Sequence, residues 1–166
     1  MITGPVRVAI EDPAARHALI AFAEISHPEL ASPIRVASDV VDYMRDGFLW
    51  RGVPFGYKLV RDGDGNPTSR MRIDNIDRTI GPALRVFRGR PTVRLEICSS
   101  ADFDLGVIPR EPLGAVTPIM GFRDFHLVNI SVDALEITAD VILQDYAQEP
   151  FPSFRATQDR TPGLFR

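Results

Sequence analysis

The sequence predicts a single, β-rich domain of the α+β class, and the prediction depends mainly on two pairs of strands and one short helix. Residues Val53–Arg61 and Thr68–Ile73 alternate between apolar and polar side chains on either side of D-G-D-G-N-P, which is typical of two strands joined by a glycine-rich turn. Two longer strands are expected at Met120–Val132 and Leu135–Asp145. Such alternation indicates strands with one face buried and the other exposed to solvent.

The predicted helix lies near the centre of the chain, between two strands. It is marked by apolar residues at helical spacing, namely Ile76, Ile80, Leu84 and Phe87. Thr79 is the preferred N-cap, because it places Pro82 in the first turn, where a missing N–H does no harm; Asp77 is the alternative cap and would place the proline a little deeper. Gly89 is the expected C-terminal cap, and a strand at Thr92–Cys98 follows it.

The remaining elements are predicted to be short, because 14 prolines interrupt the chain. A brief helix is expected at Pro13–His17, and strands at Leu19–Ile25 and Pro33–Ala37 could form a hairpin. The run Leu19–Ile25 is almost continuously apolar at its start, so we expect it to be buried. Residues Asp39–Asp46 fit either a turn of helix or an edge strand, and Asp102–Pro109 fits a short strand.

Length and composition limit the class of protein. The 166 residues are enough for one domain with a hydrophobic core, and 45% hydrophobic with 25% charged residues is ordinary for a globular protein. The net charge of -3 gives no electrostatic reason to expect nucleic-acid binding. A single cysteine excludes an internal disulfide framework and a multi-cysteine zinc site. No apolar run approaches the roughly 20 residues that span a membrane, and the first residues lack the layout of a signal peptide, so we expect a cytosolic setting.

The sequence contains only fragments of metal-binding patterns. The start of a calcium loop, D-x-D-x-N, occurs at Asp62, Asp64 and Asn66. Pro67 then stands where that loop needs a glycine, and Ile73 where it needs a glutamate, so a hairpin turn is expected instead. No zinc pattern is formed by the three histidines, His17, His27 and His126. We therefore expect neither a metal nor a cofactor.

Two features could belong to an enzyme, and each also has a structural explanation. Cys98 could be a nucleophile if a base lay near it in space, but a cysteine is more often a small buried side chain. Asp102 and Asp104 flank Phe103 and would share one face of a strand, either for acid–base chemistry or as a solvated edge. A small hydrolase is thus the alternative function. A carbohydrate-binding module would need exposed aromatic residues, and the sole tryptophan, Trp50, is expected in the core.

The end of the sequence has an unusual composition. We divide the chain into a globular domain, residues 1–148, and an extended C-terminal arm, residues 149–166, because the arm shows no period. The arm carries four apolar anchors, Phe151, Phe154, Leu164 and Phe165. Disordered tails are usually poor in aromatic residues, so we expect the arm to dock, either on its own domain or on a neighbouring subunit.

Several blocks of the sequence resemble a family of uncharacterised domains encoded in the tail-assembly clusters of tailed phages, prophages and related particles. The blocks are E-I-S-H-P-E-L-A-S-P-I-R-V-A-S-D from Glu24, V-P-F-G-Y-K-L from Val53, R-M-R-I-D-N-I-D-R from Arg70, P-T-V-R-L-E-I-C-S-S from Pro91, H-L-V-N-I-S-V-D-A-L-E-I-T-A-D from His126, and P-F-P with T-P-G-L-F in the arm. Their order and spacing carry the resemblance, and no single block is a catalytic signature.

The resemblance implies a structural protein of the virion, at the distal end of a non-contractile tail. Such minor tail proteins form a ring, here a trimer or hexamer, between the tail tube and the central hub, and share a small β-barrel or split-barrel design. The expected partners are other copies of the chain and other tail proteins; the expected location is the tail tip, after assembly in the host cytoplasm. The family has no catalytic residues to carry over. Some tail-tip relatives bind an iron–sulfur cluster through several cysteines, which Cys98 alone does not support.

Overall fold

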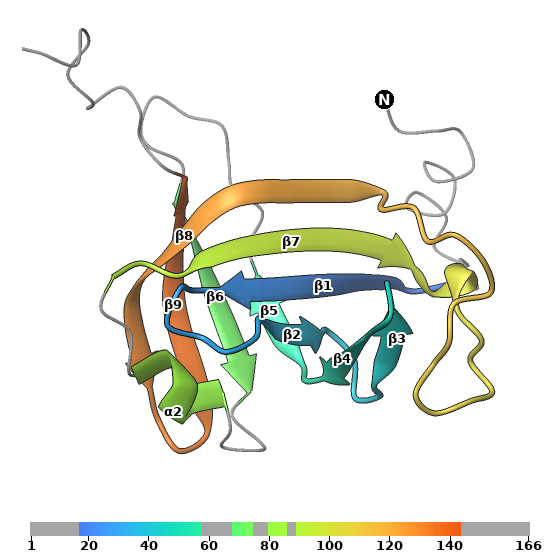
Figure 1. Ribbon diagram of the computed structural model, residues 1–166, viewed down its shortest axis with the longest axis horizontal. Helices are drawn as coiled ribbons and strands as arrows, with labels where there is room; N and C mark the ends of the chain where they lie inside the picture. Colours follow the sequence, from blue (N-terminus) through green and yellow to red (C-terminus); the bar gives the residue numbers. More distant parts are fainter. Residues whose placement is uncertain (1–16, 58–67, 75–79, 86–88, 144–166) are drawn as a thin grey trace, which may run out of the picture.

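The computed structural model describes residues 17–57, 68–74, 80–85 and 89–143, and in these ranges the protein is nearly all-β (Figure 1). The strands in chain order are β1 (Leu19–Ser26), β2 (Ile34–Ala37), β3 (Tyr43–Arg45), β4 (Phe48–Gly52), β5 (Phe55–Tyr57), β6 (Thr68–Asp74), β7 (Thr92–Ser99), β8 (Met120–Val132) and β9 (Glu136–Leu143). They form one mixed sheet in the order β3-β4-β2-β1-β7-β8-β9-β6-β5. The described helical structure is a six-residue helix, α2 (Ile80–Arg85), and a 3-10 turn, η1 (Ser100–Asp102).

The predicted strand pairs are confirmed where the structure describes them. β8 and β9 form an antiparallel hairpin, and β1 and β2 form another with Phe22 opposite Ala37. β5 pairs antiparallel with β6, although the turn between them lies outside the described residues. β1 also pairs with β7 along its whole length, and β2 and β4 are parallel neighbours. Long-range pairing therefore joins the local hairpins into one sheet.

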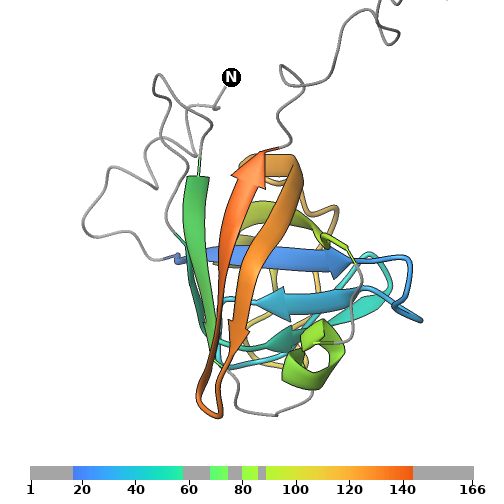
Figure 2. The same cartoon turned by 90° about the vertical axis from the view of Figure 1, so that its left-hand side faces the viewer.

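The sheet is strongly curled but does not close into a barrel, so of the two expected designs, a small β-barrel or a split barrel, the closed β-barrel is not formed. β4 ends at Gly52 and β5 begins at Phe55, and these strands belong to opposite ends of the sheet. The two residues between them make single hydrogen bonds to both sides: Val53 N–H donates to Ala37 at 3.0 Å, and the Pro54 carbonyl accepts from Asp74 at 3.1 Å. Figure 2 shows the strands wrapping around a shared interior, with α2 at one end.

The interior of the curl is the main hydrophobic core. Alternate residues of the strands supply it, among them Ile25, Val36, Ile73, Leu127 and Ile137, which are almost completely buried. Ile80 and Leu84 of α2 pack into the same cluster, which confirms the helical spacing of these two residues. The described part of the helix is Ile80–Arg85, and Ile76, Thr79 and Phe87 lie outside the described residues. Six helical residues do not make an α+β fold, so the class is nearly all-β.

A second core lies on the outer face of the sheet. It consists of Ile20, Phe22, Ala37, Tyr43, Trp50, Cys98 and Phe103. Phe22 is fully buried, and its ring lies 5.4 Å from Tyr43 and 5.3 Å from Trp50, edge to face. β3, β4 and the segment around Phe103 cover this face. This explains why β1 is apolar at consecutive positions: one side of the strand faces each core.

Three other expectations are resolved by the structure. Residues Tyr43–Arg45 form an edge strand, not a turn of helix. The segment Asp102–Pro109 is not a strand, because η1 ends at Asp102 and only Phe103 makes an isolated β-bridge, to Pro112. Trp50 is buried, as expected. The predicted helix at Pro13–His17 lies almost entirely outside the described residues.

Candidate functional site

Cys98 is placed where a nucleophile would be inactive. The side chain is fully buried in the outer core, in the same cluster as Phe22 and Phe103. Burial raises the pKa of the Cys98 thiol to about 11, and the nearby Arg45 guanidinium offsets this effect only in part. Catalytic thiols need the opposite environment, exposed and electropositive, because the thiolate is the reactive form. The position fits the structural explanation offered by the sequence.

The carboxylates of Asp102 and Asp104 do not share a strand face. Asp102 closes η1, and its backbone carbonyl accepts a hydrogen bond from Leu113 N at 2.9 Å. The Asp104 side chain accepts from Gly106 N at 2.8 Å, which is the geometry of an Asx turn. Both residues therefore shape the loop that follows η1, and the expectation of two carboxylates side by side on a strand is wrong.

The described ranges contain no group of three or more His, Cys, Asp or Glu side chains that could hold a metal ion. His27 accepts a hydrogen bond from Glu29 N at 3.1 Å through Nδ1, in the turn after β1. The calcium-like residues, Asp62, Asp64 and Asn66, lie outside the described residues, as do the arm anchors Phe151, Phe154, Leu164 and Phe165.

The structure reveals a buried ion pair that the sequence analysis did not find. Arg45, at the end of β3, pairs with Glu96 in the middle of β7, and both side chains are about 5% exposed or less. Arg94 Nε also donates to Glu96, at 2.8 Å. Burial alone would raise the pKa of the Glu96 carboxyl, but the hydrogen bonds from Arg94 and Arg45 outweigh it and hold the pKa below its usual value.

The guanidinium of Arg45 lies among aromatic rings of the outer core. Its central carbon is 5.2 Å from the centre of the Phe22 ring and 5.7 Å from that of Trp50. Its Nε lies 3.4 Å from Asp46 without hydrogen-bond geometry, and its Nη1 has no hydrogen-bond partner among the described residues. Glu96 is therefore the principal anion for this buried cation, and the pair attaches β3 to the central sheet.

A second polar network fixes the position of the loop that follows η1. The Tyr43 hydroxyl donates to Asp39 Oδ2 at 2.6 Å, and Arg110 Nη1 donates to the same oxygen at 2.7 Å. Burial, together with the nearby Asp39 carboxylate, raises the pKa of Tyr43 well above its usual value. Backbone hydrogen bonds from Met44 N to Arg110 O and from Arg110 N to Asp42 O, both 2.8 Å, run beside this network.

The loop Asp104–Glu111 presents an apolar tip to solvent. Its base is closed by the hydrogen bond from Asp104 N to Glu111 O, 2.8 Å, and by the adjacent bridge of Phe103 to Pro112. The tip reads L-G-V-I-P, and Leu105, Val107 and Ile108 are 51%, 40% and 81% exposed. Figure 1 shows this loop in yellow at one end of the molecule. Apolar side chains grouped on a fixed projection are typical of a protein-binding surface.

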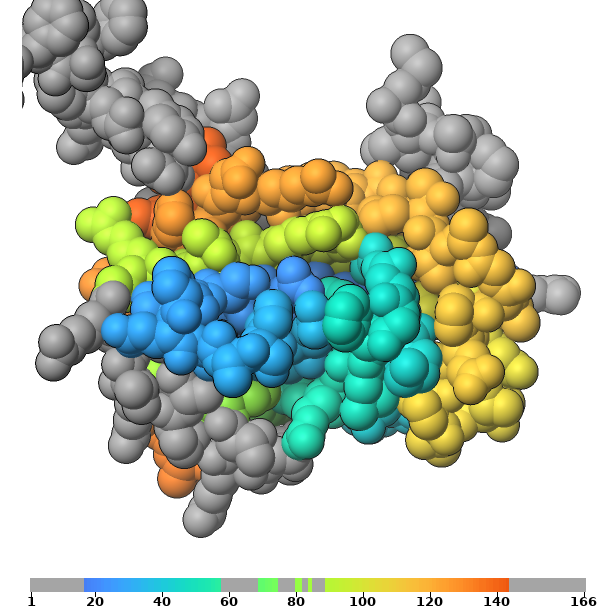
Figure 3. Space-filling view, in the orientation of Figure 1, coloured from blue at the N-terminus to red at the C-terminus, as the bar shows by residue number. Residues whose placement is uncertain are grey.

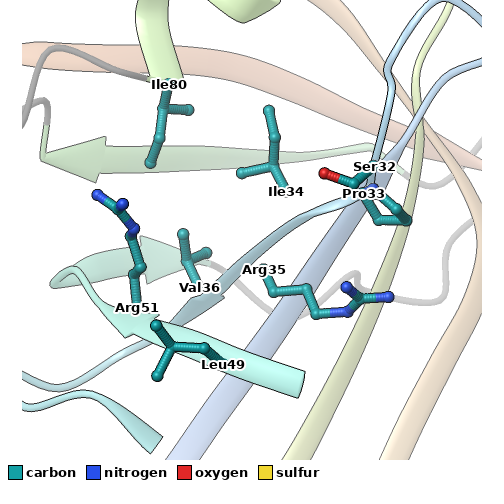
Figure 4. A pocket seen from close by; sticks show the side chains of 8 residues that line it. All are labelled: Ser32, Pro33, Ile34, Arg35, Val36, Leu49, Arg51 and Ile80. Atoms are coloured by element: carbon teal, nitrogen blue, oxygen red, sulfur yellow. The ribbon is translucent and has the colours of Figure 1, made fainter. Parts of the chain in front are cut away.

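A groove lies elsewhere on the surface, between β2, β4 and α2. It has a volume of about 350 Å³, near the lower end of the range for ligand pockets, and it is lined by Ser32, Pro33, Ile34, Arg35, Val36, Leu49, Arg51 and Ile80. Polar and apolar atoms line it about equally, and Figure 4 shows Arg35 and Arg51 on opposite sides of the apolar side chains. Arg35 Nε donates to Glu24 at 2.7 Å, and its guanidinium lies 3.9 Å from the centre of the Phe48 ring.

These features amount to two surfaces suited to binding a protein, and the described residues assemble no catalytic constellation from the candidates above. No helix in the described part of the chain is long and apolar enough to cross a bilayer. Neither the comparison with protein-family models nor the comparison with curated proteins finds a match for this chain.

Proposed function

We propose that this chain is a structural subunit of the tip of a phage-type or gene-transfer-agent-like non-contractile tail, where copies of it form a ring that joins the tail tube to the hub. The observation that carries the proposal is the loop Asp104–Glu111, whose apolar tip is held away from the core by the network around Asp39. A side chain such as Ile108, which is 81% exposed, gains by burial against a partner.

The resemblance to tail-assembly proteins agrees with the arrangement of the sheet. The block from Glu24 covers the end of β1, the turn and β2; the block from Pro91 covers β7; the block from His126 covers the later part of β8, the turn and the first part of β9. These strands are neighbours in the sheet, in the order β2-β1-β7-β8-β9. The resemblance thus concerns a continuous structural framework, as expected if the shared property is the shape of a subunit.

Two measurements test this function. Electron microscopy of particles from the source strain, labelled with antibody to this chain, is expected to show the label at the tail tip; label on the capsid, along the tail or absent from particles contradicts the proposal. In parallel, the solution mass of the full chain is compared with that of a variant ending at Gln148. A ring that becomes a monomer on truncation supports an assembly role for the arm, whereas equal masses exclude that role.

A further inference from the structure

We propose that the loop Asp104–Glu111 of one copy inserts into the groove between β2, β4 and α2 of the next copy. The inference rests on the ring function proposed above and names the two surfaces that meet. The occupant of the groove is therefore a second copy of this chain. Each copy would use its loop on one neighbour and its groove on the other.

Shape is the first argument. The loop is narrow, because its two ends are bridged directly, and its exposed apolar side chains come from three residues, Leu105, Val107 and Ile108. The groove offers apolar contact mainly through Ile34 and Leu49, because Val36 and Ile80, which also line it, are almost completely buried. Its volume of about 350 Å³ suits a few side chains better than a whole strand or helix. Anchoring by Arg110 and Tyr43 means that little conformational entropy would be lost when the loop binds.

Charge is the second argument. Asp104 and Glu111 stand at the two ends of the loop, both exposed to solvent. Arg35 and Arg51 flank the groove. Insertion of the apolar tip would bring the two acidic residues of the loop towards the two basic residues of the groove. Arg35 is already paired with Glu24, and Arg51 also interacts within its own copy, so complementary charges here would orient the loop more than they would strengthen the contact.

Placement is the third argument. Trp50 points into the outer core, so its neighbours in β4, Leu49 and Arg51, point to the other side of the strand, where the groove lies. The loop belongs to the outer-core side, through Phe103. In Figures 1 and 3 the loop forms one end of the molecule, away from α2. Since the loop is fixed at both ends, it cannot fill the groove of its own copy.

A contact between two different surfaces is heterologous, and repetition of such a contact produces a ring when the rotation closes. This property permits a sharp test. A loop variant, Ile108→Asp, keeps an intact groove, and a groove variant, Leu49→Asp, keeps an intact loop. Each variant alone lacks either a functional loop or a functional groove, so it cannot bind another copy of itself. In a mixture, the intact loop of the groove variant can bind the intact groove of the loop variant, which gives one complete contact per pair. The mixture should form one-to-one dimers and nothing larger.

The test measures solution mass by light scattering after gel filtration, on the full chain and at matched concentrations. We expect the wild type to form a closed oligomer, each variant to be monomeric with association at least about tenfold weaker, and the equimolar mixture to be a dimer. The control is Leu135→Asp, a change at an apolar side chain that is 83% exposed in the β8–β9 turn, outside both surfaces; it should leave the oligomer unchanged. Thermal unfolding of each variant confirms that it is folded.

The other outcomes overturn the inference. If Ile108→Asp and Leu49→Asp both keep the wild-type oligomer, the ring is held by other surfaces, and the proposed function stands without this contact. If the wild type is monomeric at every concentration tested, or the mixture of variants fails to form dimers, loop and groove do not bind one another. Antibody labelling of the tail tip decides the function separately, so the two failures are distinguishable.

Discussion

Replacing Glu96 with glutamine should destabilise this protein far more than replacing its partner Arg45 with methionine. The side chains of both residues are about 5% exposed or less, and removal of one partner from a buried ion pair costs about 3–5 kcal/mol of unfolding free energy. The two substitutions differ in their effect on the unfolding free energy because the residue that remains has a second partner in one case and only an exposed one in the other. Without Arg45, Glu96 keeps the hydrogen bond from Arg94. Without the Glu96 carboxylate, Arg45 is left beside the aromatic rings with Asp46, whose side chain is 69% exposed.

We therefore expect Glu96→Gln to lower the unfolding free energy by about 3 kcal/mol or more, and Arg45→Met by about 1–2 kcal/mol. Urea unfolding followed by tryptophan fluorescence is a suitable assay, because Trp50 lies in the same core as Arg45. The double variant completes a mutant cycle and gives the coupling energy of the pair. An exposed pair supplies the matched control: Arg72, which is 64% exposed, contacts Glu136, and Arg72→Gln should cost less than about 1 kcal/mol.

Two results would refute this reasoning. If Glu96→Gln costs less than about 1 kcal/mol, the carboxylate does not compensate a buried charge. If Arg45→Met lowers the unfolding free energy more than Glu96→Gln does, Glu96 depends on Arg45 more than Arg45 depends on Glu96, and Arg94 does not substitute for Arg45.

Three further predictions follow from single residues. The folded-state pKa of Glu96 lies below its unfolded value of about 4.3, so the ionised carboxylate stabilises the fold above that pH, and this contribution is lost as the pH falls through the folded pKa. Below about pH 4 the wild type should therefore lose stability more steeply with falling pH than Glu96→Gln, as measured by urea unfolding at several pH values. Cys98, with its pKa raised to about 11, should react with a thiol reagent at about pH 8 at least 100-fold more slowly in the folded than in the urea-unfolded chain; comparable rates would contradict its burial. Gly52→Ala should cost about 1–3 kcal/mol in thermal unfolding, because an added Cβ would lie 2.5 Å from backbone atoms of Val41, whereas Gly56→Ala, with nothing within 4 Å, should cost about 0.5 kcal/mol or less.

Local pattern is sufficient to predict most of the strands, because the side-chain period of a strand is visible in a few consecutive residues. It does not predict β4, and it gives β3 only as one of two alternatives. The alternation at Leu135–Asp145 and at Thr92–Cys98 marks β9 and β7 correctly, apart from their ends. The segment Asp102–Pro109 was misread for a local reason: the Asp104 side chain bonds to Gly106 N and holds a turn that competes with a strand. The curl of the sheet depends on the long-range pairs of β1 with β7 and of β6 with β9, which no local pattern specifies.

The buried charge at Glu96 was missed because alternation in β7 places this residue on the polar face, with Arg94. A signal for its burial does exist, but in a different strand. β1 is apolar at consecutive positions, so both of its faces must be covered, and Phe22 stands directly opposite Glu96 in the sheet. The residue of β7 opposite Phe22 must then be covered as well, whereas Arg94, opposite Glu24, stays about half exposed. Recognising this requires the pairing of β1 with β7, which a single sequence does not provide.

The outer core also connects stability with the proposed assembly. β3 is attached to the sheet by the buried Arg45, and the neighbouring Tyr43 and Asp39 hold Arg110 at the base of the loop. The exposed tip at Ile108 thus depends on contacts that begin at Glu96, in the centre of β7. A loop held in this way can remain apolar and exposed without collapsing onto its own domain. Its position is therefore set by the fold before any partner arrives, which is the property that a subunit needs if identical copies are to meet in one defined geometry.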